Sequence, residues 1–211
     1  MNYRILIRMA FIFATLFVAL GQRSALADDI VGVTVDTSGL GSFGNSEVFF
    51  TLTGTGGNTA TLSNISLSGG TAGTVDAGNA VGSGTNAGNG LGSGISLNDG
   101  TAFLNVFAQS FVASNQLSFL LDLTTNVVSP TPDQFSLFML DPNGNPVPTS
   151  DPTGFDNLLS INLDSTNPTP NIYSGIVSTA TPTRTPEPSS LLMLGCGLLS
   201  LALMSRRRIR S

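Results

Sequence analysis

The sequence contains no histidine and no lysine, and Cys196 is its single cysteine. Nucleophilic catalysis by a Ser-His or Cys-His pair needs a base beside the nucleophile, so this class of enzyme is excluded. Lysine-assisted chemistry and zinc sites built from His and Cys are excluded for the same reason. We therefore expect a protein that is not an enzyme, with hydrolysis by carboxylates alone as the alternative.

Basic side chains are also missing from the whole middle of the chain. The arginines are Arg4, Arg8, Arg23, Arg184, Arg206, Arg207, Arg208 and Arg210. Residues 28–183 hold eleven aspartates and Glu47, which gives a formal charge of −12, compared with −5 for the whole chain. Nucleic-acid binding is excluded, because it depends on Lys and Arg that displace counterions from phosphates. A polyanion attracts divalent cations or basic partners, or its charge serves solubility alone.

The N-terminus has the three zones of a secretory signal peptide. Arg4 and Arg8 precede an apolar run, Met9 to Leu20, and the small residues Ala25 and Ala27 follow it. The alternative is a transmembrane anchor, but this run falls short of the ~20 residues that span a bilayer. We expect a signal peptide at 1–27, cut after Ala27 by signal peptidase.

The absence of cysteine before Cys196 means that the exported part forms no disulfide. A domain of roughly 150 residues buries enough core without such crosslinks. We therefore expect one domain at 28–178, followed by a Thr/Pro linker at 179–185. Fourteen glycines between Gly54 and Gly100 predict a loop-rich region there, with short edge strands.

Short alternating apolar runs predict an all-β domain, a single antiparallel β-sandwich or jelly roll. In residues 117–123, Leu and Phe occupy every second position, so one face is apolar and the other polar. The parity changes within 60–67, which predicts a β-bulge near Ser63-Asn64. Residues 134–140 have no polar face and predict a central strand. Further strands are expected at 30–35, 48–53, 101–107, 158–163 and 171–177.

Two Asp-Pro-x-Gly sequences, at 141–144 and 151–154, predict type I turns. The first also alternates oxygen-bearing side chains, Asp141, Asn143 and Asn145, as calcium loops do, and Asp151 and Asp156 follow. An EF-hand needs glycine at its sixth position, where Pro146 stands. We expect no cofactor, with calcium at Asp141, Asn143, Asn145 and Asp151 as the alternative to plain turns.

Two motifs are compatible with enzymes that use carboxylates, but each has a simpler interpretation. Asp36-Thr37-Ser38-Gly39 is similar to the aspartic protease motif, but an extra residue separates Asp from Gly and no second copy exists. A turn at the end of a strand is the better interpretation. A glycoside hydrolase needs a pair of carboxylates, for which Glu47 is a candidate, but scattered acids make some pair inevitable.

The C-terminal 27 residues carry a specific arrangement. Pro186, Glu187 and Pro188 precede an uncharged stretch, residues 191–204, which is ~21 Å long as a helix and a little short of a bilayer core. Arg206, Arg207, Arg208 and Arg210 follow and would remain on the cytoplasmic side. An ordinary tail anchor would have the same topology.

This arrangement closely resembles the PEP-CTERM sorting signal of Gram-negative bacteria. The resemblance covers 185–211 and divides the tail, 186–211, into motif 186–188, transmembrane helix 190–205 and basic end 206–210. Thr185, where Val is frequent, and Cys196 depart from the usual pattern. The resemblance implies recognition by an exosortase, cleavage near the motif, and release after transient membrane anchoring. Such proteins accompany exopolysaccharide and biofilm formation.

The exported part also looks like an uncharacterised group of PEP-CTERM ectodomains, through segments such as Val33–Ser38 and Asp151–Gly154. No activity comes with that resemblance. We expect an exported cell-surface or extracellular-matrix protein, structural rather than enzymatic, with exopolysaccharide as a possible partner. The alternatives are a calcium- or glycan-binding module and a carboxylate-dependent hydrolase.

Overall fold

The computed structural model describes residues 27–40, 45–113, 115–126, 133–163, 168–179 and 183–184. The chain from Ala27 to Thr185 forms one compact unit. Within the described residues the fold is all-β, as the sequence pattern predicts, and the strands form two antiparallel sheets. Apart from Ala27, the expected signal peptide and sorting tail lie outside these residues.

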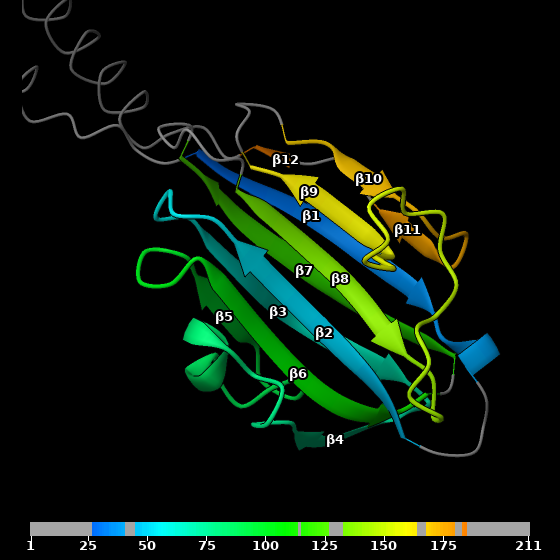
Figure 1. Ribbon diagram of the computed structural model, residues 1–211. Coiled ribbons are helices and arrows are strands. Elements are labelled where there is room, and N and C mark those ends of the chain that lie inside the picture. Colours follow the sequence, from blue (N-terminus) through cyan, green and yellow to red (C-terminus); the bar gives the residue numbers. More distant parts are fainter. Residues whose placement is uncertain are drawn as a thin grey trace, which may run out of the picture. The chain divides into compact units, whose positions relative to one another are not determined.

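One sheet, sheet A, has the order β11-β1-β7-β3-β5, and β12 also pairs with β1 (Figure 1). Its strands are β1 (Ala27–Asp36), β3 (Thr59–Ser68), β5 (Ile95–Asn98), β7 (Gln116–Thr125), β11 (Val177–Thr179) and β12 (Thr183–Arg184). β1 and β7 pair along their whole length, from Ala27 opposite Thr125 to Asp36 opposite Gln116. β12 lies within the segment expected as a linker.

The other sheet, sheet B, has the order β10-β9-β8-β2-β6-β4 and lies in front of sheet A in Figure 1. Its strands are β2 (Asn45–Thr53), β4 (Thr71–Val75), β6 (Leu104–Val112), β8 (Gln134–Leu140), β9 (Leu159–Asn162) and β10 (Pro170–Ile172). Two short 3₁₀ helices, η1 (Ser38–Leu40) and η2 (Gly82–Asn86), lie outside the sheets. β4 and β5 are edge strands, as the glycine-rich region predicts.

The core lies between the sheets, because alternating residues of each strand face the other sheet. In β7, Leu117, Phe119, Leu121 and Leu123 are buried, while Ser118 and Asp122 are half-buried on the other face. β2 and β8 contribute fully buried apolar side chains from sheet B, and these belong to the same hydrophobic cluster as those of β7. Burial of each such side chain stabilises the fold by roughly 1.5–3 kcal/mol.

The apolar residues of β3 change from one set of alternating positions to the other, and the predicted β-bulge is the cause. The register between β3 and β7 shifts between Ser63 and Ser66. Asn64 adopts φ 51°, a left-handed conformation that asparagine tolerates better than most residues. The bulge lets Leu62 reach the core before it and Leu67 pack against the core after it.

β8 is an interior strand, as its apolar sequence predicts. Phe135, Leu137 and Met139 face the core and are fully buried. On the opposite face Phe138 stacks on Phe49 of β2, with ring centroids 4.3 Å apart and an interplanar angle of 8°. Phe138 therefore has an aromatic partner on the outer face, which also carries Gln134 and Ser136.

Two expected strands differ from those observed. The strand expected at 171–177 is divided into β10 and β11, which belong to different sheets, because a turn joins Ser174 to Val177. β6 continues to Val112, beyond the expected end at Phe107. The sequence pattern is interrupted there by Gln109, which is nevertheless buried. Its amide is satisfied, since Nε2 donates to Gly73 O at 2.9 Å and Oε1 accepts from Leu91 N at 2.8 Å.

Candidate functional site

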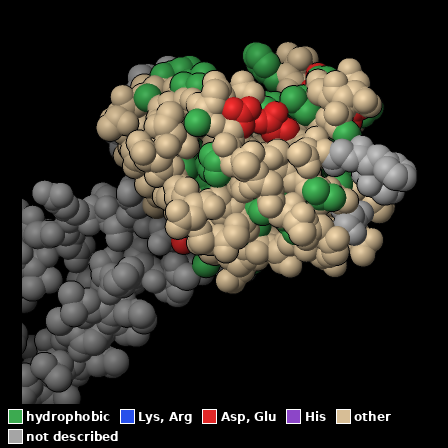
Figure 2. All heavy atoms as spheres, turned by 90° about the horizontal axis from the view of Figure 1, so that it is seen from below, with side chains coloured by type: hydrophobic (Ala, Val, Ile, Leu, Met, Phe, Trp, Pro, Cys, Tyr) green, Lys and Arg blue, Asp and Glu red, His purple; other side chains and the backbone are tan. Residues whose placement is uncertain are grey.

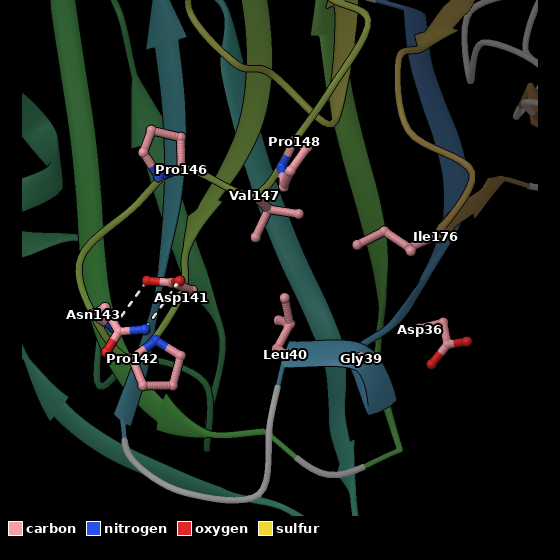
Figure 3. A pocket seen from close by; sticks show the side chains of 10 residues that line it. All are labelled: Asp36, Gly39, Leu40, Asp141, Pro142, Asn143, Pro146, Val147, Pro148 and Ile176. Carbon is pink, nitrogen blue, oxygen red and sulfur yellow. Dashed lines mark hydrogen bonds between the residues drawn. The ribbon is translucent and has the colours of Figure 1, made fainter.

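An open pocket of about 430 Å³ lies where β1 and β8 end (Figure 3). It is lined by Asp36, Gly39, Leu40, Asp141, Pro142, Asn143, Pro146, Val147, Pro148 and Ile176. The side chains of Leu40, Val147 and Ile176 point toward one another, and the two carboxylates lie on opposite sides. The pocket therefore offers an apolar centre with acceptor groups at its margins.

Three of the residues weighed as calcium ligands do come together beside this pocket. Asp141 Oδ1 accepts hydrogen bonds from Asn143 N and Asn145 N, both at 2.8 Å. Its Oδ2 accepts from the two asparagine amides, at 3.4 and 3.3 Å. The predicted turn is present, since Gly144 N donates to Asp141 O at 2.9 Å. The Asp141 carboxylate thus accepts hydrogen bonds within the turn itself.

Asp151, the fourth of these residues, organises a separate turn. Its carboxylate accepts from Thr153 N and Oγ1 and from Asn157 N and Nδ2, at 2.7–3.1 Å for the shortest contact of each donor. Gly154 N donates to Asp151 O at 3.3 Å, which closes the predicted turn. The loop presents Phe155, which is 76% exposed. Asp151 is not among the residues that line the pocket.

The hydrogen bonds change the acidity of both turn aspartates. Donation from the backbone of Asn145, joined by Asn143, lowers the pKa of Asp141 below its ordinary value. Partial burial acts to raise the pKa of Asp151, but the bonds from Thr153 and Asn157 outweigh it and the pKa is lowered. Both groups are held as carboxylates that accept hydrogen bonds.

Asp36 ends β1 and begins a turn into η1. Its Oδ1 accepts from Ser38 N at 2.9 Å. The hydroxyl and the backbone amide of Ser38 lower the pKa of Asp36. A general base works best when its pKa lies near neutral pH. The pKa of Asp36 is shifted away from neutrality, so this carboxylate is a poor general base.

Glu47 of β2 lies in contact with Asp76, which follows β4. Burial, the hydrogen bond to Asp76 and its charge raise the pKa of Glu47. Asp76 is held by Gly78 N and Asn79 N at 2.8 and 3.2 Å. The two catalytic carboxyl groups of glycosidases stand about 5 to 9.5 Å apart, so that the sugar fits between them. A pair in direct contact leaves no such space.

A second carboxyl pair, Asp99 and Asp133, was not singled out by sequence reasoning. Each residue is 1% exposed. The available signal was the glycine-rich segment Gly54–Asn58, which wraps the Asp133 carboxylate. Among the described residues, no group of three or more His, Cys, Asp or Glu side chains is placed to hold a metal ion.

The surface carries few charges on the face shown in Figure 2. Among the described residues visible there, no side chain has the colour of Lys or Arg, and acidic side chains form small spots among polar and apolar ones. None of the helical segments in the described ranges is long and apolar enough to cross a membrane.

The remaining predicted positions fall at or beyond the ends of the described ranges. Ala27 is the first residue of β1. Ala25, the motif Pro186, Glu187 and Pro188, and the basic residues Arg206, Arg207, Arg208 and Arg210 lie outside the described residues. Comparisons with family models, with curated proteins and with solved structures give no match for this chain.

Proposed function

We propose that the chain is an exported β-sandwich protein sorted by an exosortase, which acts as a structural component of the cell surface or extracellular matrix. The signal peptide and the tail resembling PEP-CTERM direct its export, transient membrane anchoring and release. In this proposal the mature domain lies within exopolysaccharide. The enzymes that process the chain are signal peptidase and an exosortase.

The observation that carries this proposal is where the folded unit begins and ends. β1 begins at Ala27, the expected signal cleavage residue, and β12 ends at Arg184, two residues before Pro186. The two strands pair, with Asp29 opposite Arg184. The folded unit thus nearly coincides with the interval between the two expected processing sites, since cutting at both would remove only Ala27 from its described strands.

The position of the pocket fits a released surface domain. Ala27 and Arg184 belong to the strand ends at one end of sheet A, whereas Asp36 lines the pocket at the other end of β1. The chain therefore enters and leaves the unit at the end opposite the pocket. A structural role is favoured over hydrolysis, because the exposed carboxylates accept hydrogen bonds within their own turns.

Glycan binding is the second candidate, and the pocket is the observation that favours it. Carboxylate and asparagine oxygens at its margin are suitable acceptors for sugar hydroxyls, while Leu40, Val147 and Ile176 offer an apolar surface. A glycan array probed with the full chain separates the candidates. Binding that is lost in Asn143→Ala, at an exposed residue of the pocket lining, would favour the second candidate over a purely structural role.

The proposal is tested in a Gram-negative host that carries an exosortase. Replacement of Pro186, Glu187 and Pro188 by alanine should leave the protein in the membrane fraction, whereas the parent reaches the medium or matrix. Pro182→Ala, four residues before the motif, is the matched control and should behave like the parent. Equal release of the motif variant and the parent would rule out exosortase sorting.

A further inference from the structure

Two buried carboxyl groups meet where the chain crosses from β2 to β3. Asp99 follows β5 and Asp133 precedes β8, so the two belong to segments of different sheets. Each is 1% exposed. Burial and the neighbouring charge of Asp133 raise the pKa of Asp99 above its ordinary value.

Both oxygens of the Asp133 carboxyl group accept hydrogen bonds. Its Oδ1 accepts from Thr55 N at 3.1 Å, and its Oδ2 accepts from Gly56 N at 3.0 Å and Asn58 Nδ2 at 2.6 Å. A Cβ atom at Gly54 or Gly56 would overlap the carboxylate, so the loop can approach this closely only with glycine. The loop is built to hold a charged acceptor.

Only one of the two oxygens of the Asp99 carboxyl group accepts a hydrogen bond from the described residues. Asn58 N donates to its Oδ1 at 2.6 Å, and the amide of Gly57 also faces the group. Within the described part of the chain no group donates to the buried Oδ2, and the Asp133 carboxyl group is within hydrogen-bond reach of Asp99. An unpaired carboxylate buried beside a second one is strongly disfavoured.

We infer that Asp99 and Asp133 form a proton-binding site, in which one proton from solvent is carried on Asp99 Oδ2 and donated to the Asp133 carboxylate. Binding forms one O–H bond, breaks no bond within the protein, and changes the charge of the pair from −2 to −1. The facing segment Gly54–Asn58 and the flanking Asn98, Gly100 and Asn126 bear no charge. Asp133 is the charged group that acts on Asp99.

A calcium ion fits the same place less well. Calcium takes about 6–8 oxygen ligands. Both oxygens of Asp133 already accept N–H donors, and Asn58 Oδ1 accepts from Asn126 N at 2.6 Å. Counting donors from the described residues, Asp99 Oδ2 is thus the one side-chain oxygen of these three residues without a donor. A single proton satisfies it.

The site makes the stability of the folded unit depend on pH in a defined direction. The pKa of Asp99 is raised on folding from its ordinary value of 3.8. The stabilising contribution of the proton is therefore complete below that value and is lost as the pH rises through the folded pKa. The site favours the folded state under mildly acidic conditions.

The experiment compares melting temperatures of the full chain and two variants, purified in detergent, from pH 4 to pH 7 with EDTA. Asp99→Asn places a permanent N–H donor against Asp133 and keeps the acceptor for Asn58 N. We expect Asp99→Asn to melt about 2–4 °C above the parent at pH 7. We expect this difference to shrink toward zero at pH 4, where the parent carries the proton.

Asp133→Asn is the matched control, because an amide there sets its NH₂ group against backbone donors in either orientation. We expect it to melt below the parent at every pH. A pH-independent difference between Asp99→Asn and the parent, or a lower melting temperature of Asp99→Asn at pH 7, would overturn the inference. So would an increase in the parent's melting temperature with millimolar calcium that Asp99→Asn does not show.

If Asp99→Asn fails to fold, ¹³C NMR titration of the parent's carboxyl groups tests the inference instead. An Asp99 signal that titrates at or below the ordinary aspartate range refutes the shared proton.

Discussion

Phe50 of β2 meets Phe119 of β7 edge to face across the two sheets, with ring centroids 5.4 Å apart and an interplanar angle of 82°. Phe50 also packs against Phe107 and Phe135 of its own sheet, each with a centroid distance of 6.4 Å. Its side chain is fully buried. Phe50 therefore joins the two sheets at the centre of a core that has no disulfide in the described residues.

Phe50→Ala should lower the free energy of unfolding by about 3–5 kcal/mol, because the other three rings cannot close the cavity. Phe50→Leu retains most of the volume and is expected to lose less. Urea unfolding of the full chain measures both. A loss below about 1 kcal/mol for Phe50→Ala would mean that Phe50 does not join the sheets as described.

Asn64 at the bulge is held at φ 51°. Asn64→Ala should destabilise the protein by about 1–2 kcal/mol, because alanine resists the left-handed conformation. Asn64→Gly should be neutral or slightly stabilising. Ser66→Ala, an exposed position on the same strand, serves as the control. Equal effects of alanine and glycine at 64 would contradict a bulge that requires this conformation.

Gly56 approaches the Asp133 carboxylate so closely that Gly56→Ala must displace it. We expect a loss of about 1–3 kcal/mol, as for other overpacked sites. Gly92 has nothing within 4 Å of an added Cβ and no positive φ, so Gly92→Ala should change stability by less than about 0.5 kcal/mol. Thermal unfolding of the two variants compares them directly. Similar losses of stability would argue against the close approach of Gly56 to the Asp133 carboxylate.

Asp141 stabilises its turn only while it is ionised. Its folded pKa is lowered from the ordinary value of 3.8, so this stabilisation is present above that pH and is lost as the pH falls through the folded pKa. Asp141→Ala should melt below the parent at pH 7, with a difference that shrinks below pH 3.8. Millimolar calcium should change neither melting temperature. A calcium-dependent increase in the parent alone would support the metal-site interpretation.

The features that depend on neighbours in the sequence were predictable. Strand alternation in 117–123, the bulge at Ser63-Asn64 and the two Asp-Pro-x-Gly turns are each determined within a few residues. The alternating oxygens at 141–145 left calcium and a turn open, because both use the same side chains. The structure shows the Asp141 carboxylate accepting hydrogen bonds from Asn143 and Asn145 within the turn.

The features that depend on topology were not predictable. Asp99 and Asp133 come together only because β5 and β8 end and begin at the same end of the two sheets. The second half of β6 was not predicted because Gln109 interrupts the apolar pattern, and its buried amide bonds to two distant segments, Gly73 of β4 and Leu91. The division of 171–177 between sheets likewise depends on which strand edges remain unpaired.

The mass of the mature protein, recovered from the surface or medium of an exosortase-bearing host, tests the central proposal most directly. Mass spectrometry of the intact chain and of its C-terminal peptide should show a protein that begins at Asp28 and ends near Pro186-Glu187-Pro188. The basic end, residues 206–210, should be absent. A mature chain that retains Arg206 to Ser211 would contradict sorting by an exosortase.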